Sequence, residues 1–211
     1  MLYLSLLELD LRCRQVQAEL RSPYEMHRTL SKAFEEGETA QAAARCLFRV
    51  EEDPQGAVRL LVQSKTAPDW DRLTLPPNYL RRQSQIKPFR PVVRNGQLLA
   101  FRLRANPAKR LPAKREGRAQ GDRVGLYTEE ERYAWLVRQA EAHGFRLEMA
   151  TVTSEEQAAC PTQGRTAVFS AVRFEGILCV TEAETFLAAL ANGIGPGKGF
   201  GFGLLSVSPL K

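Results

Sequence analysis

One stretch near the end of the chain organises the rest: Gly193-Ile194-Gly195-Pro196-Gly197-Lys198-Gly199-Phe200-Gly201-Phe202-Gly203, followed by Leu204-Leu205-Ser206-Val207. Six glycines stand at every second position of this stretch. Glycine at that density weakens both a regular helix and a packed strand. The pattern therefore predicts an ordered loop that brings the backbone close to another group, followed by a short strand over residues 204–207.

The glycine-rich stretch lacks the spacing of the common nucleotide-binding loops. A Walker A loop built on Gly197-Lys198 needs glycine at 192 and Ser or Thr at 199, where the chain has Asn192 and Gly199. No dinucleotide fingerprint followed by a helix fits either. A flexible linker is the plain alternative, but it needs none of the apolar residues found here, Ile194, Phe200 and Phe202.

We favour a contact between this loop and a phosphate backbone. Lys198 is then the point charge, and the peptide groups near it come close to the phosphates. The residues expected to make this contact are Gly195, Gly197, Lys198 and Gly199.

Composition indicates a globular protein with a polyanionic partner. Hydrophobic residues make up 44% of the 211 residues, and the net charge is +6. The four cysteines are scattered without a C-x-x-C pair, so we expect no zinc site and a reduced, cytoplasmic protein. Residues 1–12 are too short and too acidic for a signal peptide, and no apolar run reaches membrane-spanning length.

The order of predicted elements indicates an α+β protein with two tandem ferredoxin-like units, the topology of RNA-recognition motifs. In residues 1–105 we predict strands at 2–9, 46–50, 58–64 and 97–104. A helix begins at Ser22-Pro23 and runs to residue 34 or 36, and a short helix is possible at 68–75. Residues 106–123 form a basic linking loop.

In residues 124–211 we predict helices at 128–143 and 181–191 and strands at 145–152 and 204–207. Residues 167–180 form two further strands around Glu175-Gly176.

Histidine is the residue type that changes charge near neutral pH, and the chain contains His27 and His143. His143 ends a helix before Gly144, which is a common structural position. His27 lies one turn after Tyr24 and one turn before Ser31, so the three share a helix face. This face is also what a helix packed on a sheet would show, and the residues alone favour that plainer interpretation.

Several motifs, in order along the whole chain, resemble the CRISPR repeat-RNA-processing endoribonucleases of the type I-E Cascade complex. They are Pro23–Arg28, Phe101–Pro107, Phe174-Glu175-Gly176 and the glycine-rich stretch from Gly193 to Pro209. The resemblance identifies Pro23–Arg28 with the catalytic helix of that family, which outweighs the packing interpretation of His27. It implies a CRISPR repeat hairpin as substrate, other Cascade subunits as partners, no membrane and no metal or other cofactor.

The reaction implied is metal-independent cleavage by attack of a ribose 2′-OH on the adjacent phosphate. His27 can accept the 2′ proton or protonate the leaving oxygen. A phenol is ordinarily protonated at neutral pH, so Tyr24 is expected to donate or orient. Arg28 and Lys32 would stabilise charge in the transition state. We expect His27, Tyr24 and Lys32 to be catalytic, and Arg28 and Ser31 to contact RNA.

A strongly basic segment runs from Lys87 to Arg123, with eleven Lys or Arg residues against two acids. A charge run is usually a solvated face, but the corresponding segment in the family grips the stem of the hairpin. The expected RNA contacts are Arg102, Arg104, Lys109, Arg110, Lys114, Arg115 and Arg118.

Two rival functions remain open at this stage. A non-catalytic protein of the same fold could hold the hairpin as a scaffold, which would need neither His27 nor Tyr24. Charge and fold alone would also fit a protein that binds ribosomal or transfer RNA.

Overall fold

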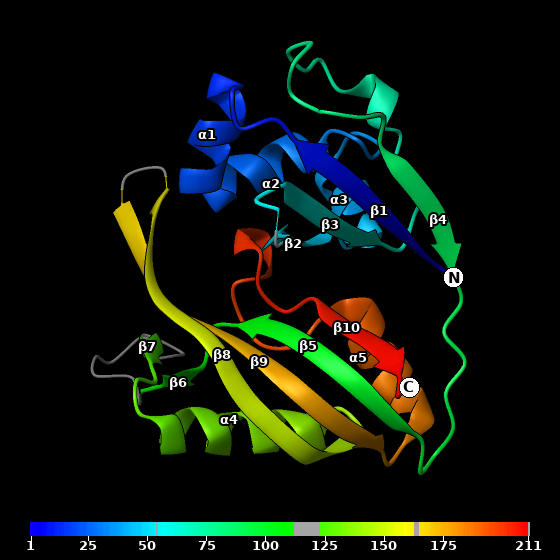
Figure 1. The fold of residues 1–211 in the computed structure, drawn as a ribbon. Helices are drawn as coiled ribbons and strands as arrows, with labels where there is room; N and C mark the ends of the chain where they lie inside the picture. The colour runs from blue at the N-terminus through cyan, green and yellow to red at the C-terminus, as the bar shows by residue number, and fades with distance from the viewer. Residues whose placement is uncertain (54, 112–122, 163–164, 211) are drawn as a thin grey trace.

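The computed structural model describes residues 1–53, 55–111, 123–162 and 165–210. Two four-stranded antiparallel sheets dominate the fold (Figure 1). Each sheet carries helices on one face, and the two sheets approach each other through their other faces. The predicted fold class, α+β with two tandem ferredoxin-like units, is confirmed.

The N-terminal sheet has the strand order β2-β3-β1-β4. Its elements are β1 (Leu2–Leu9), α1 (Arg14–Arg21), α2 (Pro23–Ser31), α3 (Glu38–Ala44), β2 (Leu47–Glu52), β3 (Val58–Ser64), the 3-10 turn η1 (Trp70–Arg72) and β4 (Gln85–Phe89). The fourth strand contains Pro88 and pairs only with β1, which is the edge position that proline tolerates. We had predicted an irregular segment there.

The C-terminal sheet has the strand order β10-β5-β9-β8. Its unit consists of β5 (Leu98–Ala105), α4 (Glu129–Ala142), β8 (Phe145–Thr162), β9 (Arg165–Val180), α5 (Ala183–Asn192), the 3-10 turn η2 (Lys198–Phe200) and β10 (Leu205–Pro209). A small hairpin, β6 (Ala108–Arg110) with β7 (Arg123–Gly125), follows β5. The order β5-α4-β8-β9-α5-β10 is the complete β-α-β-β-α-β of a ferredoxin-like unit.

The strand predicted at 97–104 therefore does not complete the first unit. These residues form β5, which pairs with β9 and β10 in the second sheet. The fourth strand of the first sheet is β4, which pairs with β1. Alternation of buried and half-buried residues predicts a strand but not its partner. The topology favours a boundary between Phe89 and Leu98 in place of the expected one after residue 105.

Two further predictions need correction, and one helix was missed. Residues 167–180 are one continuous strand, because Gly176 stays within the ladder opposite Ala150 and Phe101. Helix α2 ends at Ser31 and continues only as single-turn bonds, such as Phe34 N–H to the Ser31 carbonyl at 3.2 Å. Helix α3 was not predicted at all. Thr128 caps α4 as expected, accepting from the Glu131 N–H at 3.2 Å.

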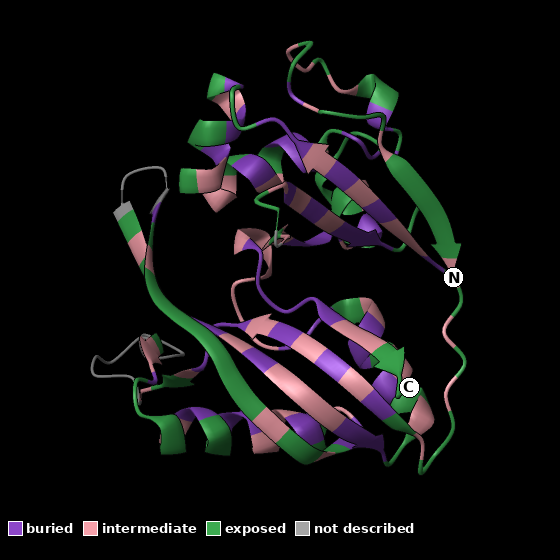
Figure 2. Cartoon of the chain, viewed as in Figure 1, coloured by how far each residue is buried: buried purple, intermediate pink, exposed green. Residues whose placement is uncertain are grey.

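Each unit has its own hydrophobic core between its sheet and its helices, visible as the buried stripes of Figure 2. Polar side chains join the two units. The Gln63 side-chain amide donates to the Leu190 carbonyl at 2.6 Å, and Lys65 Nζ donates to Asn192 Oδ1 at 2.7 Å. Arg49, which is 2% exposed, donates to the Leu204 carbonyl at 3.0 Å. These bonds place the glycine-rich segment against α2.

Candidate active site

His27 is a half-buried residue of α2, a helix whose Met26, Thr29 and Leu30 are buried. Its Nδ1 lies 3.2 Å from the Ser31 Oγ, and that hydroxyl also lies 2.8 Å from the His27 carbonyl. A hydroxyl has one proton, and the carbonyl can only accept it. We infer that Ser31 donates to the carbonyl and accepts from Nδ1–H, which leaves Nε2 of the neutral ring with its lone pair free.

Burial lowers the pKa of His27 below its usual value of 6.5, and a hydrogen bond to its own backbone opposes this shift. Burial therefore favours the neutral ring over the cation. A neutral imidazole with a free Nε2 can accept a proton from a hydroxyl placed next to it.

The glycine-rich segment forms the wall opposite His27. A Cβ built on Gly199 would lie 2.7 Å from Cδ2 and 3.2 Å from Nε2 of His27, closer than a side chain can approach. Gly201 faces the Phe48 ring in the same way at 3.0 Å, and Phe48 lies 6.2 Å from the His27 ring. Glycine is thus required here because the backbone passes directly against the histidine and its neighbour.

The other glycines of the segment also pack against protein side chains. A Cβ on Gly195 would meet the Trp135 ring at 2.9 Å, and one on Gly197 would meet the Phe202 ring at 2.9 Å. Lys198 is half-buried, and burial followed by the nearby charge of Arg45 lowers its pKa. The predicted RNA contacts of Gly195, Gly197, Lys198 and Gly199 stay predictions.

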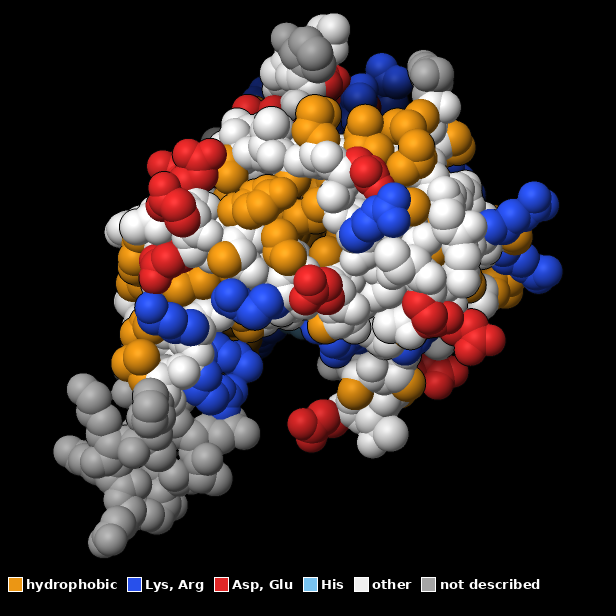
Figure 3. Space-filling view, turned by 90° about the horizontal axis from the view of Figure 1, so that it is seen from below, with side chains coloured by type: hydrophobic (Ala, Val, Ile, Leu, Met, Phe, Trp, Pro, Cys, Tyr) orange, Lys and Arg blue, Asp and Glu red, His pale blue; other side chains and the backbone are white. Residues whose placement is uncertain are grey.

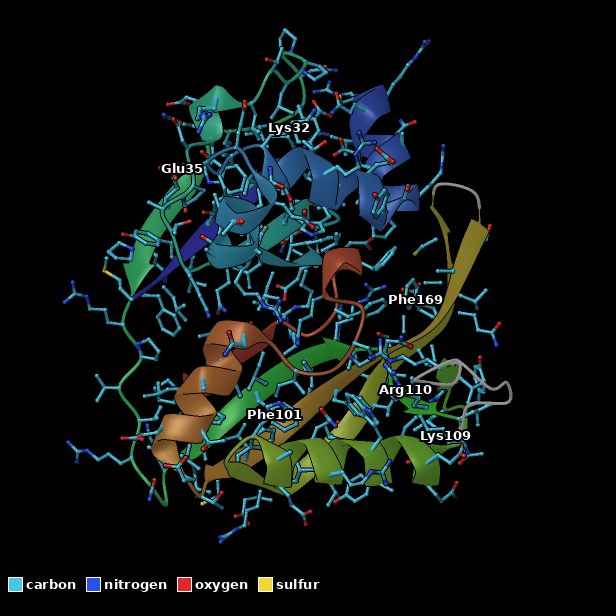
Figure 4. The ribbon with its side chains drawn as sticks, turned by 180° about the vertical axis from the view of Figure 1, so that it is seen from behind. Lys32, Glu35, Phe101, Lys109, Arg110 and Phe169 are labelled. Carbon is cyan, nitrogen blue, oxygen red and sulfur yellow. The ribbon has the colours of Figure 1, made fainter. Side chains whose placement is uncertain are left out.

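An aromatic cluster borders the site. The Tyr24 ring lies 6.0 Å from Phe200, Phe200 lies 4.6 Å from Phe169, and Phe169 lies 5.3 Å from Phe202. The guanidinium of Arg104 stands 4.6 Å over the Phe202 ring. Sequence reasoning missed Phe169, because β9 contributes it from a position with no motif. Figure 4 shows Phe169 beside the hairpin β6–β7, on which Lys109 and Arg110 lie.

The structure separates the other residues predicted on α2. Ser31 bonds to His27 rather than standing free for RNA. Arg28 forms an exposed ion pair with Glu25 at 2.8 Å. Lys32 is exposed at the end of the helix (Figure 4), and its side chain makes no hydrogen bond or ion pair with the described residues. The structure brings Tyr24 and Ser31 near His27, but shows no contact between His27 and Lys32.

The predicted RNA-binding arginines of β5 are paired with acids. Arg102 lies between Glu175 at 2.8 Å and Glu51 at 3.3 Å. Arg104 pairs with Glu156 at 2.6 Å. Arg102 therefore belongs to the contact between the units, whereas Arg104 remains close to the aromatic cluster. Their contacts with RNA stay predictions.

The basic hairpin β6–β7 carries Lys109, Arg110 and Arg123, all exposed. Lys109 also pairs with Glu131 at 3.0 Å. Figure 3 shows Lys and Arg side chains gathered at the end of the molecule that carries this hairpin. The remaining predicted contacts, Lys114, Arg115 and Arg118, lie outside the described residues.

The described part of the chain has neither a cluster of metal ligands nor a membrane-spanning helix. It contains no group of three or more His, Cys, Asp or Glu residues arranged to hold a metal ion. Within the same residues, no helix has both the length and the apolar character needed to cross a membrane.

The chain is similar over its whole length to characterised proteins. A family model described as CRISPR associated protein matches residues 2–209. The CRISPR-associated endoribonuclease Cse3 of Thermus thermophilus is 39% identical over 99% of this chain and 100% of its own length. The Cascade subunit CasE of Escherichia coli is 32% identical over 90% of this chain and 94% of its own.

Solved structures agree with these matches. Thermus thermophilus Cse3 bound to an RNA representing a pre-cleavage complex has a TM-score of 0.85, with 40% identity and 99% of each chain covered. Cas6e from Escherichia coli has a TM-score of 0.71, with 27% identity and 100% of each chain covered. The resemblance first seen in the ordered motifs is confirmed, and the chain belongs to the Cse3/CasE (Cas6e) family of CRISPR-associated endoribonucleases.

Proposed function

We propose that this protein cleaves CRISPR precursor RNA at the base of each repeat hairpin and stays bound to the product as a Cascade subunit. The relatives support the substrate and the assembly: Cse3 was solved with RNA, and a neighbour of TM-score 0.67 and 28% identity is a CRISPR RNA-guided surveillance complex. The observation that carries the chemistry is the half-buried His27, whose free Nε2 lies against Gly199.

His27 Nε2 would accept the proton of the attacking 2′-OH or, when the ring is protonated, donate a proton to the leaving 5′-oxygen. In the first case the 2′-oxygen bonds to phosphorus as the P–O5′ bond breaks, and the leaving 5′-oxygen takes a proton from solvent, which gives a 2′,3′-cyclic phosphate and a 5′-OH. Tyr24, at the edge of the aromatic cluster, would orient the substrate. Lys32 would reach the phosphate through its flexible side chain.

A non-catalytic scaffold is the second candidate. It would use the basic hairpin β6–β7 and the fold but would not need a neutral histidine facing a glycine.

The four buried free cysteines fit a protein that works in the cytoplasm.

The test measures single-turnover cleavage, in excess EDTA, of the CRISPR repeat RNA encoded by the same genome. It compares the His27→Ala variant with the wild type. We expect cleavage to be lost while the RNA affinity stays near that of the wild type. His143→Ala is the matched control, because the only other histidine bonds to the Gln139 carbonyl at 2.7 Å and is expected to be dispensable.

A repeat RNA with one 2′-deoxy substitution before the cut should bind and remain intact. Cleavage of the deoxy strand would refute 2′-OH attack, and normal cleavage by His27→Ala would refute the assignment of His27.

A further inference from the structure

A cleft of about 560 Å³ lies between the two units, beside the start of the catalytic helix. Its first wall belongs to the N-terminal unit and is mostly apolar, with Leu11, Leu20, Pro23, Val50 and Val58 beside Glu52. Its second wall belongs to the C-terminal sheet and carries Arg104 and Arg173. Through Arg104, this wall continues into the aromatic cluster that reaches Tyr24.

Arg173 is the unusual residue of this cleft. It stands directly opposite Arg104 across the β5–β9 ladder, and like charges in that position repel each other. Its Nε is buried and has no hydrogen-bond partner, and the described residues supply no ion pair for its guanidinium. A buried guanidinium donor without an acceptor costs free energy unless a ligand provides the acceptor.

The acids around the cleft are committed to other cations or are exposed. Glu156 pairs with Arg104 at 2.6 Å, and Glu155 pairs with Arg132. Glu52, the third acid of the lining, is exposed. Arg173 is thus the cation in the cleft that still lacks a negative partner.

We propose that Arg173 binds a phosphate of the single strand that continues past the cut, as this strand leaves the active site through the cleft. This inference rests on the proposed function. The cleft volume is in the range of sites for small ligands, roughly 300–1,000 Å³, which suits a few nucleotides of single strand and excludes a duplex. The apolar wall offers a surface to an unstacked base, and a guanidinium suits a phosphate.

The stem of the hairpin is expected on the basic hairpin β6–β7. That hairpin borders a different pocket, lined by Phe169, Phe200 and Arg123, on another side of the aromatic cluster. The aromatic cluster would therefore separate the stem from the strand beyond the cut. This arrangement gives the two parts of the RNA separate contacts that can be removed one at a time.

The test compares two uncleavable 2′-deoxy repeat RNAs. One ends at the cut, and the other continues past it as a single strand. We expect Arg173→Gln to weaken binding of the longer RNA about tenfold, because one charged hydrogen-bonding contact is lost. The slope of log affinity against log salt should fall by about 0.7 for that RNA. Binding of the shorter RNA should not change, and Arg173→Lys should restore the salt slope.

Arg138→Gln is the matched control, since Arg138 is exposed on α4, which covers the opposite face of the sheet (Figure 1). It should leave both affinities unchanged. Equal binding of the longer RNA by Arg173→Gln and the wild type would overturn the proposal, as would an equal loss for both RNAs. A wild-type protein that fails to cleave ordinary repeat RNA would instead refute the proposed function itself.

Discussion

The buried arginine between the two units is the contact whose removal tests most directly how the site is assembled. Arg49 is 2% exposed and lies on β2, next to Phe48, which faces His27. It donates to the Leu204 carbonyl at 3.0 Å and to Ser206 Oγ at 2.9 Å, directly after the glycine-rich segment. Its Nε donates to Glu51 at 2.8 Å. We expect Arg49 to hold the segment against α2.

Arg49→Met keeps the length of the side chain and removes the guanidinium. The Leu204 carbonyl and the Ser206 hydroxyl lose their donor, and each orphaned polar group costs about 1–3 kcal/mol. Glu51 keeps Arg102 at 3.3 Å, so it is not left without a counter-charge. We expect a loss of about 3 kcal/mol in the free energy of unfolding, at the lower end of what breaking a fully buried ion pair costs.

The assay is urea unfolding together with single-turnover cleavage at a temperature where the variant is folded. Arg59→Met is the control, because Arg59 is 43% exposed and pairs with Asp53 at 2.9 Å on the surface, where a salt bridge contributes about 1 kcal/mol or less. Cleavage by Arg49→Met should slow more than RNA binding weakens. Equal unfolding midpoints for the two variants would refute the energetic reasoning, and normal cleavage by a destabilised Arg49→Met would refute the positioning role.

Three further predictions concern other parts of the site. Gly199→Ala should slow cleavage at least about tenfold with little change in RNA affinity, because the new Cβ would displace His27. The φ angle of Gly199 is one that alanine adopts, so the substitution does not strain the backbone. Unchanged cleavage would show that the His27 ring has room to move. Lys109→Ala with Arg110→Ala should lower the salt slope of hairpin binding by about 0.7–0.9 for each lost phosphate contact, and an unchanged slope would make the hairpin β6–β7 a solvated surface. The pKa of His27 is depressed in the folded protein, so its contribution to stability is complete above the usual value of 6.5 and is lost as pH falls through the folded-state pKa. Relative to His27→Gln, the wild type should therefore lose stability between pH 7.5 and pH 5.5 in urea unfolding, and a constant difference would contradict this.

The sequence predicted local elements better than their partners. Strand alternation identified β5, but pairing with β9 joins Leu98 to Cys179 and could not be seen in local periodicity. Pro88 argued against a strand at this position, because proline has no N–H to donate within a central strand. However, β4 is an edge strand, where proline is tolerated. Helix α3 was not predicted, because its sequence, ETAQAAA, has no apolar face and follows Gly37.

The candidate site was predictable where one helix contributes it. Tyr24, His27 and Ser31 share a face by spacing alone. Phe169 and Arg49 had no local signal, because their roles depend on contacts with residues more than 30 positions away. Spacing also suggested a residue that the structure does not bring to the site. Lys32 is close to His27 in sequence, but the helix turns it away from His27.

The division of the site between the two units bears on how a single histidine can suffice. The N-terminal unit supplies His27 and fixes its tautomer through Ser31, whereas the C-terminal unit supplies the backbone of Gly199 and the ring of Phe200. Neither wall exists without the other, so we expect rate enhancement to come largely from holding the ribose and phosphate in line between them. An imidazole kept neutral by burial needs only to lie beside the 2′-OH in that geometry. Contacts that fix the docking, foremost Arg49, should therefore influence the chemical step although they do not touch the RNA.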